Sequence, residues 1–171
     1  MMEAARDAAG KRRNHTKLLA VTVLTSMNSL QLKQGGVGRS PKDQVLHLAR
    51  MARDAGMDGV ITSPLEVATV RKACGPNFLI VVPGIRPAPQ TPFKSFSRSS
   101  SSRTKRPASD DQSRIATPAA ALLAGADYLV IGRPILDASD PVAAADAILR
   151  EMDSATRALK SGNNSITARQ T

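Results

Sequence analysis

Two arginines in this sequence have the type and placement needed to bind a phosphate group. Arg86 lies in the string PGIRP and Arg133 in the string GRP, and each string directly follows a short apolar run. A guanidinium presents a planar fork of N–H donors that matches phosphate oxygens. Gly84 and Gly132 would let the backbone approach a ligand closely. The pair predicts a phosphate site, although either arginine taken alone would equally fit a solvated loop.

Other residues that often carry chemistry lack the neighbours that they would need. His15 and His47 have no second histidine or carboxylate at metal-ligand spacing, so we expect no metal site. Cys74, the single cysteine, closes an expected helix and has no histidine or aspartate context to activate it. We therefore expect Cys74 to serve in packing.

The elements that must position the two arginines follow a regular alternation. Apolar runs rich in β-branched residues predict strands buried on both faces, at residues 18–24, 58–62, 78–82 and 127–131. Helical periodicity and start and stop residues predict helices at 41–55, 64–74, 117–124 and 140–159, with 1–9 as the tail of another. The fold class is therefore α/β, a (β/α) TIM-barrel-type sheet of about four units, with ligands bound at the strand ends.

Two segments do not follow this alternation. Residues 89–109 are rich in Ser, Pro and Arg and have no periodicity, which predicts a disordered basic insertion. Residues 161–171 have few side chains to bury, which predicts a flexible tail. We expect one partial barrel domain over residues 1–160, interrupted by this insertion.

The net charge of +10 is concentrated rather than spread. Residues 89–109 contribute five of the ten net charges, and a second basic cluster lies between Lys11 and Lys17. The distribution fits an enzyme-like domain with two basic loops. RNA binding through residues 94–106, with Phe93 and Phe96 as stacking platforms, is a weaker alternative because no folded module accompanies the aromatics. No run approaches the roughly 18 apolar residues of a membrane span, and the charged start is not a signal peptide, so we expect a cytoplasmic protein without membrane contact.

Several strings at the expected strand ends together resemble one family. They are AVTVLTS at 20–26, GMDGVITS at 56–63, PGIRPA at 83–88, DDQSRIATP at 110–118 and GADYLVIGRPI at 125–135. In this order they resemble bacterial orotidine 5'-phosphate decarboxylase, over residues 1–151 and over the C-terminal half of its barrel only. The last string also resembles other phosphate-binding barrels, such as sugar-phosphate decarboxylases, whereas its combination with PGIRP and DDQ is specific.

The resemblance implies a function and a set of binding residues. The family converts orotidine 5'-phosphate to UMP with release of CO2 in pyrimidine biosynthesis, without a cofactor, and is generally a homodimer. By resemblance, Arg86, Gln112 and Arg133 would hold the substrate phosphate beside the Gly132 backbone. Thr25 would contact the pyrimidine, and Gln112 would bridge phosphate and base.

The sequence departs from the family pattern in two places. The family's catalytic Asp-x-Lys-x-x-Asp motif does not occur here, so we assign no catalytic residue and expect no turnover by this chain alone. The loop between Arg86 and Gln112, which is short in the family, holds the basic insertion. Two alternatives remain open, a degenerate fragment and a non-catalytic half-barrel that binds nucleotide phosphates. Unpaired sheet edges predict self-association.

Overall fold

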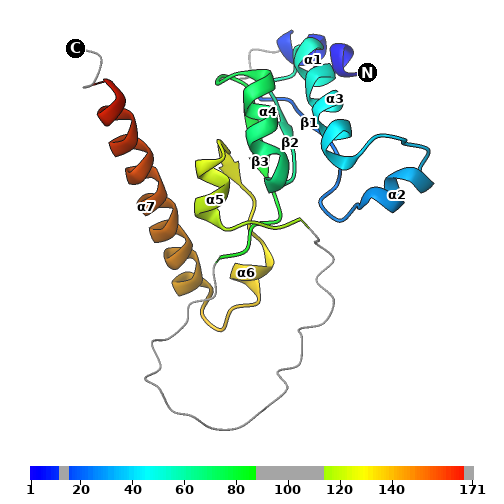
Figure 1. Ribbon diagram of the computed structural model, residues 1–171. Coiled ribbons are helices and arrows are strands. Elements are labelled where there is room, and N and C mark those ends of the chain that lie inside the picture. The colour runs from blue at the N-terminus through cyan, green and yellow to red at the C-terminus, as the bar shows by residue number, and fades with distance from the viewer. Residues whose placement is uncertain (12–15, 88–113, 168–171) are drawn as a thin grey trace.

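The computed structural model describes residues 1–11, 16–87 and 114–167. For residue 160 and residues 162–167 it describes the backbone alone. Its centre is a four-stranded parallel sheet with the strand order β1-β2-β3-β4 (Figure 1). The strands are β1 Leu19–Val21, β2 Gly59–Ile61, β3 Leu79–Val82 and β4 Tyr128–Leu129. Because each strand pairs with the next one along the chain, the sheet has the order of consecutive strands in a (β/α) barrel.

One helix precedes β1, and helices follow each strand. They are α1 Met2–Gly10, α2 Ser29–Gln34, α3 Pro41–Asp54, α4 Val67–Cys74, α5 Pro118–Leu123, α6 Arg133–Leu136 and α7 Pro141–Thr167, with the 3-10 turn η1 Pro64–Glu66 before α4. Side-chain caps begin α3, α5 and α7, and at α7 the Asp140 side chain accepts a hydrogen bond from the backbone N–H of Ala143. The Ser40 hydroxyl accepts a hydrogen bond from the backbone N–H of Asp43, and the Thr117 hydroxyl accepts one from Ala120. A proline follows each cap, where its missing N–H costs no helical hydrogen bond.

The expected α/β fold is confirmed, while several boundaries differ. All four expected strands are present but shorter, and the expected helix at 64–74 is divided between η1 and α4. The helix expected to end at residue 159 continues to Thr167, so that expected end is wrong. The predicted insertion at 89–109 lies outside the described residues. Its disorder, the flexibility of the tail and the domain division stay predictions.

The α2 helix was not expected from periodicity because it is too short to show any. Its sequence signal is a capping box: the Asn28 side chain accepts from the Gln31 backbone N–H, and the Gln31 side chain accepts from the Asn28 backbone N–H. The spacing of Asn and Gln three residues apart could therefore have revealed this helix. The short α6 helix has no comparable side-chain cap.

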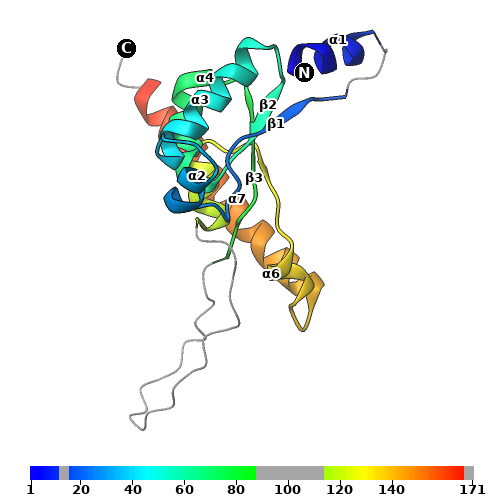
Figure 2. The same cartoon turned by 90° about the vertical axis from the view of Figure 1, so that its right-hand side faces the viewer.

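The hydrophobic core lies on one face of the sheet. Val60, Ile80 and Val82 are fully buried there, beneath α3 and α4, which lie on the same side of the strands in Figure 2. Burying side chains of this size is the main contribution to the stability of a small domain. The helix-covered face therefore holds the fold together.

The opposite face of the sheet is not covered by any element that the structure describes. Strand pairing aligns Val21, Ile61, Val81 and Tyr128 in one row across it. The two end members are largely exposed, Val21 at 56% and Tyr128 at 59%, while the two between them are half-buried. Such a row corresponds to a layer of side chains inside a closed barrel, and it leaves the inner face of this partial barrel apolar and accessible.

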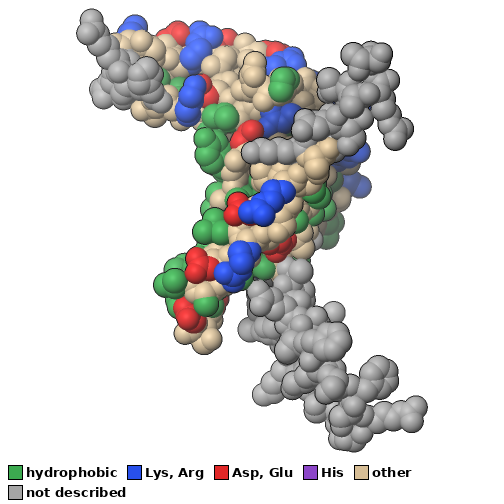
Figure 3. Space-filling view, turned by 90° about the vertical axis from the view of Figure 1, so that its left-hand side faces the viewer, with side chains coloured by type: hydrophobic (Ala, Val, Ile, Leu, Met, Phe, Trp, Pro, Cys, Tyr) green, Lys and Arg blue, Asp and Glu red, His purple; other side chains and the backbone are tan. Residues whose placement is uncertain are grey.

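The last helix also leaves apolar side chains exposed. It packs against α5 and α6, while Val142 and Leu149 on it remain exposed. Figure 3 faces this side of the molecule and shows hydrophobic side chains lying between charged ones. Among the described helices, none combines the length and apolar character needed to cross a membrane.

Two aspartates tie neighbouring strands together where the strands begin. Asp58 accepts a hydrogen bond from the backbone N–H of Leu18 and forms an ion pair with Lys17, both at 2.8 Å. Asp127 accepts from the backbone N–H of Ile80 at 2.7 Å and pairs with Arg71 at 2.6 Å. In both cases a carboxylate joins the start of one strand to a cation and to the strand before it.

Arg71 extends this network. Its guanidinium donates to the backbone carbonyls of Gly75, Phe78 and Gly125 at 2.7–3.1 Å, besides pairing with Asp127. One side chain therefore joins the end of α4, the start of β3 and the turn before β4. The strand-start end of the sheet is thus held by charged groups whose hydrogen-bonding capacity is well used.

Candidate functional site

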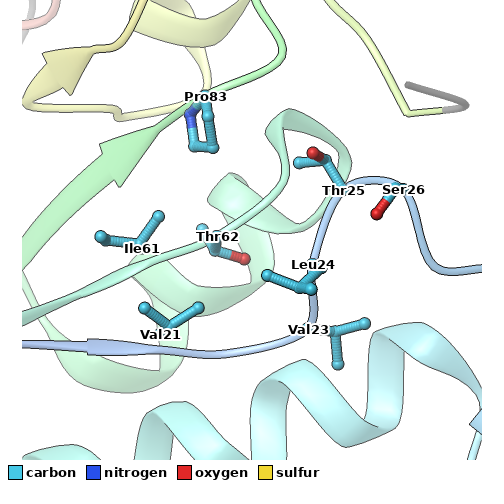
Figure 4. A pocket seen from close by; sticks show the side chains of 8 residues that line it. All are labelled: Val21, Val23, Leu24, Thr25, Ser26, Ile61, Thr62 and Pro83. Carbon is cyan, nitrogen blue, oxygen red and sulfur yellow. The ribbon is translucent and has the colours of Figure 1, made fainter. Parts of the chain in front are cut away.

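A cavity of about 180 Å³ lies at the carboxyl ends of the first three strands (Figure 4). Its lining combines aliphatic side chains with hydroxyl groups: Val21, Val23, Leu24, Thr25, Ser26, Ile61, Thr62 and Pro83. Thr25 and Ser26 follow β1, Thr62 follows β2 and Pro83 follows β3. Ligands of parallel βα folds bind at this end of the sheet, so the cavity is the candidate site.

Thr62 places a buried hydroxyl at the wall of the cavity. Its side chain is only 1% exposed, and its hydroxyl oxygen has no hydrogen-bond partner in the described part of the chain. Burying a hydroxyl without a partner is unfavourable. The hydroxyl is therefore a local cost to stability at the wall of the cavity.

A buried ion pair lies beside the cavity. The Nη1 of Arg114 is 3.0 Å from Oε1 of Glu66, and the two side chains belong to residues that are 8% and 5% exposed. The Nη2 of Arg114 also donates to the carbonyl of Leu24 at 2.9 Å and lies 3.5 Å from that of Val23. Sequence reasoning assigned no role to Arg114 or Glu66, because nothing in the sequence marks either residue as buried.

Three of the predicted binding residues lie at the strand ends as expected. Thr25 is half-buried and lines the cavity. Arg86, also half-buried, follows β3 and donates its backbone N–H to the carbonyl of Ala116 at 2.9 Å. Arg133 follows β4, starts α6 and is exposed. Gln112 lies outside the described residues, so its placement is not described.

The glycines at this end differ in what they contribute. Gly84 is buried and has a φ of 80°, a left-handed conformation that favours glycine over other residues. It turns the chain between β3 and Arg86. Gly132 is exposed, and a Cβ added to it would meet no atom within 4 Å, so its backbone has open space in front of it.

The remaining candidates lie elsewhere or lack partners. Cys74 is near the strand-start end, beside Asp58 and Phe78. Burial raises the pKa of its thiol, which disfavours the reactive thiolate. Across residues 1–11, 16–87 and 114–167, no cluster of three or more His, Cys, Asp or Glu side chains could hold a metal ion.

The fold and the position of the cavity define a (β/α)-barrel protein whose candidate site lies at the carboxyl ends of its strands. The model of the orotidine 5'-phosphate decarboxylase / HUMPS family matches residues 1–148. The chain therefore belongs to this family, as the strand-end strings predicted.

Curated relatives agree with the family match. The chain is 48% identical over 155 residues to the orotidine 5'-phosphate decarboxylase of Trichlorobacter lovleyi, covering 89% of this chain and 57% of that protein. It is 47% identical to that of Geobacter sulfurreducens, covering 86% of this chain and 55% of the relative. The chain thus spans little more than half the length of these relatives.

A solved structure gives the same result. The crystal structure of orotidine 5'-phosphate decarboxylase from Lactobacillus acidophilus is 38% identical and superposes with a TM-score of 0.64, covering 89% of this chain and 58% of that one. An uncharacterized conserved protein from Geobacillus kaustophilus superposes with a TM-score of 0.62 at 29% identity, with the same coverage. The expected partial barrel is therefore confirmed.

Proposed function

We propose that this chain is the nucleotide-binding part of an orotidine 5'-phosphate decarboxylase, which converts orotidine 5'-phosphate to UMP and CO2 in pyrimidine biosynthesis. The observation that carries the proposal is the placement of Thr25 in the cavity, at the same end of the sheet as Arg86 and Arg133. A nucleotide needs both an apolar wall for its base and cations for its phosphate. We propose a cytoplasmic location and no cofactor, as in the family.

Four of the five predicted residues receive a role that suits their position. Arg86 and Arg133 follow the neighbouring strands β3 and β4, and together they hold the phosphate with charge-assisted hydrogen bonds. The Gly132 backbone approaches the same group because no side chain intervenes. Thr25 contacts the pyrimidine within the cavity. Gln112 bridges phosphate and base, a role that rests on the family resemblance alone.

The chain is proposed to bind without performing the chemical step. The family's Asp-x-Lys-x-x-Asp motif is absent from this sequence, so no lysine is assigned to protonate the carbanion-like transition state. In such enzymes, binding energy from the phosphate supports catalysis at a distant reacting carbon. A chain that carries only the phosphate-binding residues would contribute this binding energy. The catalytic groups would have to come from another polypeptide segment.

The test combines a binding measurement with an activity measurement. Titration calorimetry of the 171-residue chain with UMP should show binding, which R86M and R133M each weaken by about tenfold or more because a charged hydrogen bond to the phosphate is lost. R157Q is the matched control, since Arg157 is an exposed residue of α7. Equal loss in all three variants, or no binding by the unaltered chain, would refute the proposal.

Activity is followed by the ultraviolet absorbance of orotidine 5'-phosphate. The chain alone should be inactive, and activity should appear when it is mixed with the N-terminal half of a family member. Turnover by the chain alone would show that a group within this sequence replaces the motif. Inactivity of the mixture, with UMP binding retained, would favour a nucleotide-binding half-barrel without a catalytic role.

A second candidate function is pairing with another half-barrel. The row of Val21, Ile61, Val81 and Tyr128 lies on a face that no described element covers, and β1 and β4 are the edge strands. Exposed apolar faces and strand edges tend to associate. Light scattering should therefore detect a dimer or larger species, which V21D and Y128D would dissociate. A monodisperse monomer at micromolar concentration would count against this candidate.

The RNA-binding alternative remains a prediction. It depends on residues 94–106, which lie outside the described part of the chain. A lack of binding to single-stranded RNA at low salt would dismiss it, because phosphate contacts are strongest under those conditions.

A further inference from the structure

The buried pair of Arg114 and Glu66 contacts the segments that follow different strands. Glu66 closes η1, which follows β2. Arg114 lies shortly before α5, in the connection from β3 to β4. Its guanidinium reaches the carbonyl groups of Val23 and Leu24, which follow β1. One ion pair therefore joins three strand-end segments beside the cavity.

Stability alone is a poor explanation for this pair. Removing both charges from water is costly, and apolar residues of similar volume are often at least as stabilising. The pair is also incompletely satisfied, since Oε2 of Glu66 and Nε of Arg114 are buried without partners in the described part of the chain. A role in holding the neighbouring backbone in place explains this ion pair better than a contribution to stability does.

The pair holds the backbone that forms one wall of the cavity. Val23, Leu24 and Thr25 all line it, and the regular pairing of β1 ends just before them, with the Thr22 N–H donating to Ile61. Beyond that point, the carbonyl of Leu24 accepts from both the backbone N–H of Met27 and the guanidinium of Arg114. Arg114 therefore holds this segment in place beyond the end of β1, where hydrogen bonds between strands no longer hold it.

We infer that Arg114 is a positioning residue for nucleotide binding: held by Glu66, it fixes the segment that carries Thr25 so that this segment meets the base. The inference rests on the proposed function, since it assumes that a nucleotide occupies the cavity. Arg114 is not a phosphate ligand, because its guanidinium is buried and already paired with a carboxylate. Its effect therefore falls on the base and not on the phosphate.

The first test needs no ligand. Hydrogen–deuterium exchange of the full chain is compared with that of R114Q, R114K and E66Q, with R157Q as the control. In R114Q, R114K and E66Q, amides of residues 22–28 should exchange about tenfold faster, because the hydrogen bonds that order the segment are lost. Those of α3 and α5 should change little. An unchanged rate in residues 22–28, or the same acceleration in every segment, would overturn the inference. If R114Q does not fold, R114K and E66Q decide.

The second test separates base binding from phosphate binding. Calorimetry compares UMP with ribose 5-phosphate, which lacks the base. In E66Q and R114K, affinity for UMP should fall about tenfold while affinity for ribose 5-phosphate stays within about twofold. Equal loss for both ligands would overturn the positioning role. If the unaltered chain binds neither ligand, the proposed function fails, and the exchange experiment still decides whether Arg114 orders the segment.

Discussion

The two ends of the sheet differ in how their polar groups find hydrogen-bond partners. Where the strands begin, Asp58 and Asp127 each accept a backbone N–H and pair with a cation. Where the strands end, Thr62, Glu66 and Arg114 each retain a buried atom without a partner in the described part of the chain. The aspartates at the strand-start end have hydrogen-bond partners, whereas three buried atoms at the other end have none among the described residues.

This difference indicates a division between stability and binding. In (β/α) barrels the strand-start end serves stability and the strand-end loops serve chemistry. Unsatisfied buried groups destabilise a fold, so keeping three of them at the strand ends is a cost without benefit unless a ligand or another segment satisfies them. Substitutions at the two ends should therefore affect different properties.

The largest expected effect is on stability at the strand-start end. R71M removes hydrogen bonds to several backbone carbonyls and leaves Asp127 without its cation. We expect the free energy of unfolding in urea to fall by about 3 kcal/mol. R157M, at an exposed position on α7, is the control and should change it little. A similar small change in R71M would show that the strand-start network is not stabilising.

The next effect compares two glycines. A Cβ at Gly59 in β2 would overlap the carbonyl oxygen of Leu79 and lie 2.5 Å from its Cβ, whereas one at Gly132 meets nothing within 4 Å. G59A should lower the free energy of unfolding by about 2 kcal/mol through overpacking. G132A should leave it nearly unchanged and weaken UMP binding instead. The comparison fails if chemical denaturation finds both variants equally stable.

A smaller effect depends on pH. The hydrogen bond from Lys17, followed by the one from the Leu18 backbone, lowers the pKa of Asp58 below its ordinary value of 3.8. A carboxylate with a lowered folded-state pKa stabilises the protein above the unfolded value and loses that contribution as the pH falls through the folded pKa. At pH 7, D58N should be less stable by about 1 kcal/mol. The expected loss is small because Lys17 is largely exposed and water screens its charge.

The sign of this dependence is what the measurement checks. Urea titrations of both proteins between pH 7 and acid should show a constant difference down to the ordinary value of 3.8. Below it the difference should shrink, because protonated Asp58 resembles the asparagine. A difference that grows toward acid would contradict the pKa direction.

The smallest effect, expected for T62V, comes from a comparison of two threonines that follow neighbouring strands. The Thr22 hydroxyl donates to the carbonyl of Ile61 at 2.9 Å, while the Thr62 hydroxyl has no partner in the described residues. T22V should lower the free energy of unfolding by about 1 kcal/mol, and T62V should raise it by about 0.5 kcal/mol. Calorimetric melting checks both. Destabilisation by T62V would mean that its hydroxyl is satisfied in the free protein.

Local sequence patterns were sufficient for the order of elements and for the end of the sheet at which three candidate binding residues lie. Buried runs such as the one around Ile80 identify parallel strands because both faces need apolar side chains. Ser40 and Pro41 mark a helix start because the cap and the missing N–H act within one turn. The same order of elements placed Thr25, Arg86 and Arg133 at one end of the sheet.

The sequence by itself therefore determined the alternating strands and helices, the family and the end of the sheet where the candidate binding residues lie. Only the tertiary structure decided that Arg114 meets Glu66 across 48 positions of the chain and reaches the backbone beside Thr25. It also decided that the Thr62 hydroxyl is buried without a partner among the described residues. The physical reason is range: strand and cap signals depend on neighbours within a few residues, whereas burial and ion pairing depend on segments that meet only when the sheet assembles.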